Sequence, residues 1–233
     1  MDSTTWVLQI SIVIAKVVGL LSAIGSAYII YDMVINVKDS RDRKKNLHRS
    51  FDRLLLCLCV SDCISSISYF LGSWSIPANA PVGLEDVWGG PGIWDKIYPH
   101  ASGNTGTCTT QGFFLYIGCC SSVLFTGSIA ISFLLQVKYQ FHEKQMRLAE
   151  KVLFGVSTGF PLLAAIIILA NRGFNPVLFG NCFIETSPSF CGASDVYLSQ
   201  RPRLESYCAN NNTDIRGKHT RTYNYIFSMS PLV

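Results

Sequence analysis

The sequence predicts an all-α membrane protein with four full transmembrane helices and the start of a fifth. Only 15% of its 233 residues are Asp, Glu, Lys or Arg, against about 25% in a typical soluble domain, and its mean hydropathy is +0.30. Charged residues are missing from five segments, which are 17–31, 63–84, 97–137, 152–171 and 222–233. This composition excludes a disordered chain. It also argues against a nucleic-acid partner despite the net charge of +4, because the basic residues merely separate apolar segments.

Four segments are long enough to cross a lipid bilayer. A helix needs roughly 20 apolar residues to cross about 30 Å of hydrocarbon, and the predicted spans are 8–35, 54–77, 109–137 and 152–171. A fifth apolar run, 223–233, is too short to span. We therefore expect residues 1–233 to form one domain that stops partway through a larger membrane domain. A four-span protein with a short apolar tail is the alternative.

The basic residues predict the orientation of these spans. The loops after the first and third spans hold eleven Lys and Arg, whereas the loop after the second holds only Lys96. Because cytoplasmic loops carry the excess of Lys and Arg, the N-terminus is expected outside the cell. The long loop 172–222 then lies outside as well, although three of its six basic residues are close to the fifth run.

The cysteines agree with this orientation. Five of the nine lie within predicted spans, and the other four all fall on the predicted outer face: Cys108, Cys182, Cys191 and Cys208. An even set on the oxidising side predicts disulfides, and four cysteines allow three connectivities. The same face carries Asn211-Asn212-Thr213, a glycosylation sequon that makes Asn211 a candidate acceptor.

Signals of an enzyme or a metal centre are poor. The four histidines are scattered along the chain, and no two of them share a helical face as a metal pair would. Cys57, Cys59 and Cys63 lie in a predicted membrane helix with no fourth ligand in sight, so they are interpreted as small packing residues. We therefore predict no catalytic residue, metal or cofactor.

Asp62 is the most informative single residue. It lies eight residues after Leu54, about 12 Å into the predicted span on its cytoplasmic side. A carboxylate there normally faces a bundle interior or a wet cavity. Ser65, Ser66 and Tyr69 share its helical face and could hydrogen-bond to it. Asp62 is therefore either a cation site or conformational switch, or a carboxylate that these hydroxyls satisfy to fix packing.

The third span is expected to be an internal helix. Gly118, Ser122 and Thr126 recur every four residues, which allows neighbouring backbones to approach closely. Gln111 and Tyr116, near its outer end, are candidates for the wall of a ligand pocket. A purely structural role for these two residues is an equally good interpretation.

Three stretches carry a resemblance to a known family. They are CLCVSDCISSISYFLGSWSIP (Cys57–Pro77), CTTQGFF (Cys108–Phe114) and FNPVLFGNCFIETSPSFC (Phe174–Cys191). They resemble seven-helix G-protein-coupled receptors, in particular the cyclic-AMP-receptor-like and secretin-profile (family 2-like) group of microbial eukaryotes. The resemblance covers about residues 8–233.

The resemblance implies a partial seven-transmembrane helix bundle, truncated in helix five. It implies a Cys108–Cys182 bridge and makes Asp62 the buried acidic residue of helix two. Such a receptor sits in the plasma membrane and transmits the signal of an extracellular ligand, here unknown, to a heterotrimeric G protein. Without the later helices, the chain as written is not expected to signal alone. The Asp/Glu-Arg-Tyr triplet of rhodopsin-like receptors is absent from the end of the third span, so their switches are not transferred.

The alternative function is a four-span adhesion or scaffold protein of the tetraspanin or claudin kind. In those proteins the long cysteine-rich loop lies between two spans, whereas here it follows the fourth. A transporter or channel is favoured less, because it would need paired intramembrane charges or broken helices with repeat symmetry.

Overall fold

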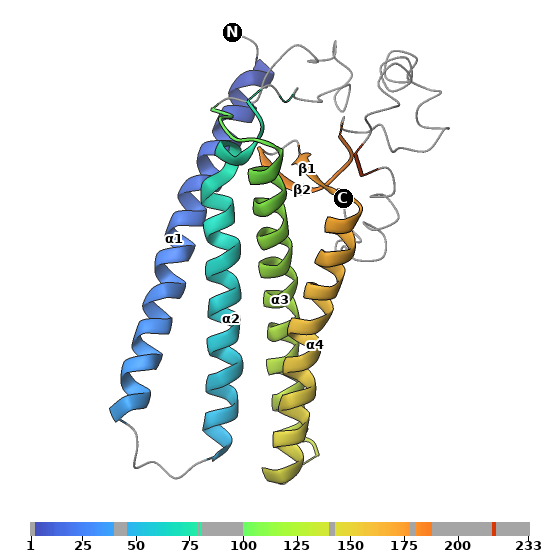
Figure 1. The fold of residues 1–233 in the computed structure, drawn as a ribbon. Coiled ribbons are helices and arrows are strands. Elements are labelled where there is room, and N and C mark those ends of the chain that lie inside the picture. Colours follow the sequence, from blue (N-terminus) through green and yellow to red (C-terminus); the bar gives the residue numbers. More distant parts are fainter. Residues whose placement is uncertain are drawn as a thin grey trace.

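Four long helices lie side by side in the order of the sequence (Figure 1). They are α1 (Ser3–Asp39), α2 (Asn46–Leu71), α3 (Thr105–Val137) and α4 (Glu143–Ala170). The structure, a computed structural model, describes residues 3–39, 46–78, 80, 100–139, 143–177, 180–187 and 216–217. The predictions made for Cys191, Cys208, Asn211 and the apolar run 223–233 lie outside the described residues.

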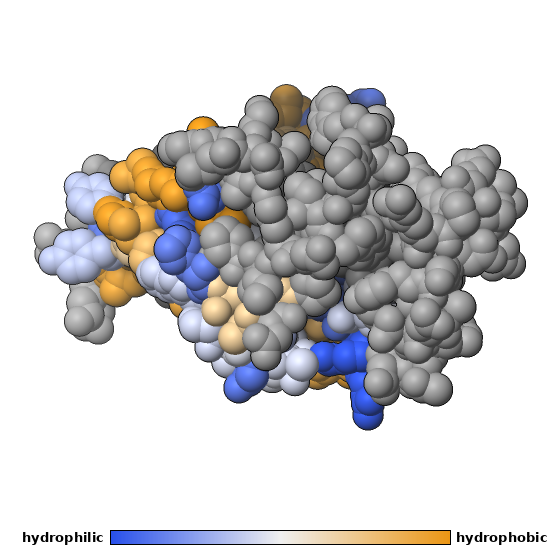
Figure 2. All heavy atoms as spheres, turned by 90° about the horizontal axis from the view of Figure 1, so that it is seen from above, coloured by the Kyte–Doolittle hydropathy of each residue, from blue (hydrophilic) through white to orange (hydrophobic). Residues whose placement is uncertain are grey.

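All four helices are long and apolar enough to cross a membrane, which confirms the predicted class of an all-α membrane protein. The qualifying segments are Gln9–Ile35, Phe51–Ser75, Thr105–Val137 and Gln145–Ala170. Large apolar side chains such as Leu21, Val123 and Leu163 are mostly exposed. Figure 2 shows hydrophobic residues reaching the edge of the molecule on the side where α1 lies. Contact with lipid accounts for this surface, so the chain is an integral multi-pass membrane protein that contacts the bilayer.

All four helices begin earlier than the predicted spans, and α2 and α4 differ most. α2 begins at Asn46 and α4 at Glu143, eight and nine residues before the predicted spans. The extra turns contain Lys and Arg, which are good helix formers but poor membrane residues, so an apolar window cannot find them. α2 also ends at Leu71, and a short 3-10 helix, η1 (Gly72–Ser75), precedes Pro77.

α3 begins at Thr105, four residues before the predicted span, because a reciprocal cap fixes its first turn. The Asn104 side chain accepts a hydrogen bond from the backbone N–H of Thr107 at 2.9 Å. The Thr107 hydroxyl oxygen accepts one from the backbone N–H of Asn104 at 2.8 Å. Two of the free N–H groups at the helix start are thereby satisfied.

An antiparallel hairpin follows α4, where the sequence predicted only an ordered loop. Its strands are β1 (Phe174–Val177) and β2 (Asn181–Ile184), with Phe174 opposite Ile184. α4 ends with Arg172 in the left-handed region at φ 52°, and the N–H of Gly173 bonds the carbonyl of Ile168 at 3.0 Å. This pattern is a Schellman cap. We call the end of the bundle that carries η1, β1 and β2 the hairpin end (Figure 1).

Glycines let both neighbours approach α2 closely. A Cβ atom placed on Gly19 of α1 would lie 2.9 Å from the carbonyl oxygen of Ser66. One placed on Gly118 of α3 would lie 2.7 Å from the backbone nitrogen of Ser65. α2 is therefore held between α1 and α3 at nearly the same level, as in membrane bundles that use small residues at their interfaces.

Candidate functional site

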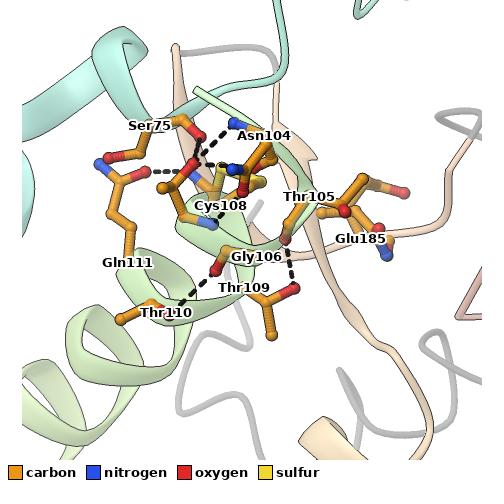
Figure 3. Close-up of a disulfide and its surroundings, with 12 residues drawn as sticks. Ser75, Asn104, Thr105, Gly106, Cys108, Thr109, Thr110, Gln111 and Glu185 are labelled. Atoms are coloured by element: carbon orange, nitrogen blue, oxygen red, sulfur yellow. Dashed lines mark hydrogen bonds between the residues drawn. A yellow bond between two sulfur atoms is a disulfide. The ribbon is translucent and has the colours of Figure 1, made fainter. Parts of the chain in front are cut away.

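A disulfide joins α3 to the hairpin. Cys108 in the first turn of α3 and Cys182 in β2 are bonded, with their Cα atoms 5.3 Å apart. This is the pairing that the family resemblance implied. Both cysteines are buried beside Ile76, which follows η1, and Figure 3 shows the bond within the capped first turns of α3. Segments 74 residues apart are therefore tied together covalently at the hairpin end.

Gln111 makes a second, non-covalent link between the same elements. Its side-chain N–H groups donate to the carbonyls of Ser68 at 2.8 Å and Gly72 at 3.0 Å. Its side-chain oxygen accepts from the backbone N–H of Cys182 at 3.1 Å (Figure 3). Only 3% of Gln111 is exposed. One amide therefore connects α3 to the end of α2, to η1 and to β2.

Tyr116 lies one turn further along α3, in the apolar core beneath the hairpin. It is fully buried, and its ring centroid is 6.3 Å from that of Phe174 in β1 and 6.1 Å from that of Phe183 in β2. Gln111 and Tyr116 both lie within the protein's own packing, where a ligand would reach them only after the hairpin moves. Ligand contact by these residues stays a prediction.

Asp62 lies in the middle of the membrane segment of α2, as the twelfth of the 25 residues Phe51–Ser75. Asp62 is still in the half of the segment that the sequence predicted, but it lies next to the centre because the segment begins three residues earlier. The Ser122 hydroxyl of α3 donates to the Asp62 carboxylate at 2.6 Å. Within the described ranges, this is the only hydrogen bond to that carboxylate, and it has no ion pair.

The expected hydroxyl partners of Asp62 bond elsewhere. The Ser65 hydroxyl donates to the backbone carbonyl of Asp62 at 3.1 Å, not to its carboxylate. The Ser66 hydroxyl donates to that of Ser22 in α1 at 2.9 Å, and Tyr69 is partly exposed. Ser65 and Ser66 are both buried, but the hydroxyl that bonds the Asp62 carboxylate comes from the neighbouring helix. A role for Asp62 as a cation site or switch stays a prediction.

Similar polar pairs link each helix to the next. Ser22 of α1 meets Ser66 of α2, and the hydroxyls of Ser128 in α3 and Ser157 in α4 are 2.9 Å apart. At the end opposite the hairpin, Arg53 and Glu150 form an ion pair at 3.4 Å. Hydroxyl pairs of this kind contribute about 0.6 kcal/mol each on average between membrane helices. The interfaces in the middle of the bundle therefore rest mainly on close packing.

The segment after the hairpin returns to it. Ser187 and Arg216 exchange two backbone hydrogen bonds, at 3.0 and 2.9 Å. Burial, and then the nearby positive charge of Arg172, lower the pKa of the Arg216 guanidinium. Two arginines distant in the sequence are therefore neighbours near the end of α4.

Within the described part of the chain, no group of three or more His, Cys, Asp or Glu residues could hold a metal ion. From the sequence, Ser122 was not identified as the partner of Asp62. Gln111 was also not identified as a link between α3 and the hairpin. The signal available was the presence of a polar residue on an otherwise apolar helix, which marks an internal face but does not identify the partner. No protein-family model matches the sequence, and no curated protein matches it either.

Proposed function

We propose that this chain belongs to a seven-helix, G-protein-coupled-receptor-like signalling receptor without enzymatic activity. The proposal includes a plasma-membrane location with the N-terminus and the hairpin outside, and an extracellular ligand whose signal passes to a heterotrimeric G protein. The observation that carries it is the Cys108–Cys182 bridge. A segment tied across the outer end of the bundle is in position to pass a ligand contact on to α3.

α3 supplies a route from the hairpin to the membrane middle. Its first turns hold Cys108 and Gln111, and four turns further along the same helix Ser122 bonds Asp62. A small rotation or shift of α3 would lengthen that single hydrogen bond, while the disulfide would stay intact. A ligand that favours the shifted arrangement would move the equilibrium between two helix packings, which is what a receptor requires.

The opposite end offers a surface of suitable charge for an acidic intracellular partner. Arg53, Lys138, Arg147 and Lys151 lie toward the ends of α2, α3 and α4 there, and all four are exposed. Basic residues at this position are also explained by attraction to anionic lipid, so they support the G-protein partner less than the bridge supports the receptor.

The test begins with the transcript, read past the codon for Val233. The longest product is then placed in lipid nanodiscs with a purified heterotrimeric G protein, and the rate of GTPγS uptake by the G protein is measured. We expect two or more further apolar spans and faster uptake than with empty nanodiscs. A stop codon directly after Val233 together with unchanged uptake would overturn the receptor proposal.

A four-span adhesion or scaffold protein is the second candidate. Gly155 and Gly159 lie on one face of α4, and a Cβ atom on either would meet nothing within 4 Å. Either a second copy of the protein or a further helix of the same chain could pack closely against this face of α4. If the transcript ends at Val233, a Gly159→Cys variant should form disulfide-linked dimers in membranes, and failure to do so would count against the scaffold.

A further inference from the structure

Lys16 of α1 lies against η1 at the hairpin end. Its ammonium group is 4.0 Å from the centroid of the Trp74 ring. Its aliphatic part covers Gly72, where an added Cβ atom would lie 2.9 Å from Cε of Lys16. Gly72 also has a φ of +48°, a backbone conformation that glycine adopts without strain. Within the described residues, Lys16 has no ion pair with a carboxylate.

Two buried polar side chains next to Gly72 lack a hydrogen-bond partner in the described part of the chain. The Asn181 side-chain oxygen and the Ser73 hydroxyl accept and donate no hydrogen bond there, although Asn181 is only 5% exposed and Ser73 is fully buried. The Asn181 oxygen lies 3.8 Å from the Cβ position of Gly72, the position that Lys16 also contacts. The large majority of such buried side-chain atoms are hydrogen-bonded in native proteins, so this arrangement points to a bound polar molecule.

The location favours a lipid as that molecule. Lys16 is the eighth residue of the membrane-spanning segment Gln9–Ile35. It therefore lies toward the hairpin end of that segment. Trp74 is 45% exposed, and the neighbouring Val13 and Val17 of α1 are exposed too. Lysine and tryptophan at this depth typically reach the headgroup level of the bilayer. The ammonium group has N–H donors to spare beyond the one directed at the ring.

We propose that Lys16 and Trp74 bind the phosphate of a phospholipid headgroup. In this site the Lys16 ammonium and the Trp74 indole N–H donate to the phosphate oxygens. Asn181 and Ser73 complete the site through water bonded to the ammonium. The lipid would fix α1, which packs on α2 and η1, to the hairpin end. This inference rests on the membrane-spanning helices and not on the proposed receptor function.

The test is native mass spectrometry of the purified protein in detergent with added phosphatidylglycerol. A Lys16→Met variant keeps the length and the apolar part of the side chain but loses the charge. We expect it to retain the lipid about fivefold less well than the unmodified protein, the effect of one lysine at a membrane surface. Lys138→Met is the comparison variant: Lys138 also lies near an aromatic ring, 5.7 Å from the ring centroid of Tyr139, but at the opposite end. It removes the same charge from an exposed lysine that attracts anionic lipid only in a general way, so we expect it to lower lipid retention less than Lys16→Met does.

A second variant separates loss of the site from loss of the fold. Asn181→Asp supplies an internal anion beside Lys16, so it should reduce lipid retention while the Cys108–Cys182 disulfide still forms in peptide mapping. Equal retention by Lys16→Met and the unmodified protein would overturn the proposal, as would unchanged retention by Asn181→Asp. If inorganic phosphate at millimolar concentration displaces the lipid completely, the site takes free phosphate and the lipid assignment is wrong.

Discussion

The two regions that α3 connects are held together in opposite ways. At the hairpin end, a disulfide and three hydrogen bonds of Gln111 join α3 to β2, η1 and the end of α2. In the membrane middle, α3 meets α2 through the close approach of Gly118, the hydrogen bond between Ser122 and Asp62, and one between the side chains of Tyr69 and Cys119. The same helix is therefore fixed at one end and lightly constrained at its centre.

This difference shows where a movement of the bundle would begin. Breaking a covalent bond or stranding a buried amide is expensive, whereas hydroxyl pairs and van der Waals contacts between membrane helices exchange at small cost. We therefore expect substitutions at the hairpin end to unfold the protein, and substitutions in the membrane middle to shift the packing of its helices. The predictions below test this contrast by thermal unfolding in detergent, followed with a dye that reacts with exposed thiols.

Removing the bridge should have the largest effect. The double variant Cys108→Ala/Cys182→Ala releases a loop of 74 residues, and we expect a loss of about 4 kcal/mol of unfolding free energy. Cys57→Ala, which removes a free and partly buried thiol, is the control. A melting temperature no lower than that of the control would show that the bridge does not stabilise the hairpin end.

Gln111→Leu should have the next largest effect. Leucine can neither accept from the backbone N–H of Cys182 nor donate to the carbonyls of Ser68 and Gly72. Leaving these buried groups without a partner costs about 3 kcal/mol in total. Gln136→Leu makes the same change on a partly buried residue at the other end of α3. If both variants melt at the same temperature, the amide of Gln111 is not the link that its geometry indicates.

Gly118→Ala should have a smaller effect in the membrane middle. The new methyl group would press on the backbone nitrogen of Ser65 at 2.7 Å, so α2 and α3 must separate at a cost of about 2 kcal/mol. Gly127→Ala on the same helix meets nothing within 4 Å and should stabilise by about 0.5 kcal/mol through helix propensity. Equal effects of the two substitutions would contradict the close approach.

Asp62→Asn should have the smallest effect, with the opposite sign. Asparagine keeps an oxygen that accepts from Ser122, and it removes a charge from the middle of the membrane. We expect a gain of about 1 kcal/mol. In an intact receptor the same variant should alter sodium sensitivity or coupling. Unchanged signalling would leave Asp62 with a packing role only.

Much of the architecture could be predicted from the sequence, because hydropathy and length decide which segments enter the bilayer. All four spans were found. The recurrence of Gly118, Ser122 and Thr126 indicated an internal face of α3, and Gly118 and Ser122 do contact α2. Thr126 does not fit this prediction, because it is exposed and its hydroxyl donates to the carbonyl of Ser122 in the same helix. The helix starts at Asn46 and Glu143 were missed, since those turns lie beyond the apolar windows. The hairpin was missed as well, although Gly180 between two short apolar runs was a usable turn signal.

The candidate site was predicted less completely, and the reason is geometric. The sequence showed that Asp62 needs a polar neighbour, but helical spacing reports only neighbours on the same helix, so Ser65 and Ser66 were expected. The contact with Ser122 depends on how far α3 slides along α2, and the close approach at Gly118 fixes that position. For the same reason, the sequence could not decide between a ligand-facing and a structural role for Gln111, whose side-chain N–H groups donate to backbone carbonyls in the structure.

By itself the sequence determined that this protein lies in a membrane, which segments cross it, and which polar residues had to find partners, because the bilayer does not supply hydrogen bonds. Only the tertiary structure decided what those partners are. It paired Ser122 with Asp62, joined Gln111 to the hairpin, and seated Lys16 on Gly72 beside Asn181. These contacts join residues between about 55 and 165 positions apart, and their register is set by packing between helices that no local pattern encodes.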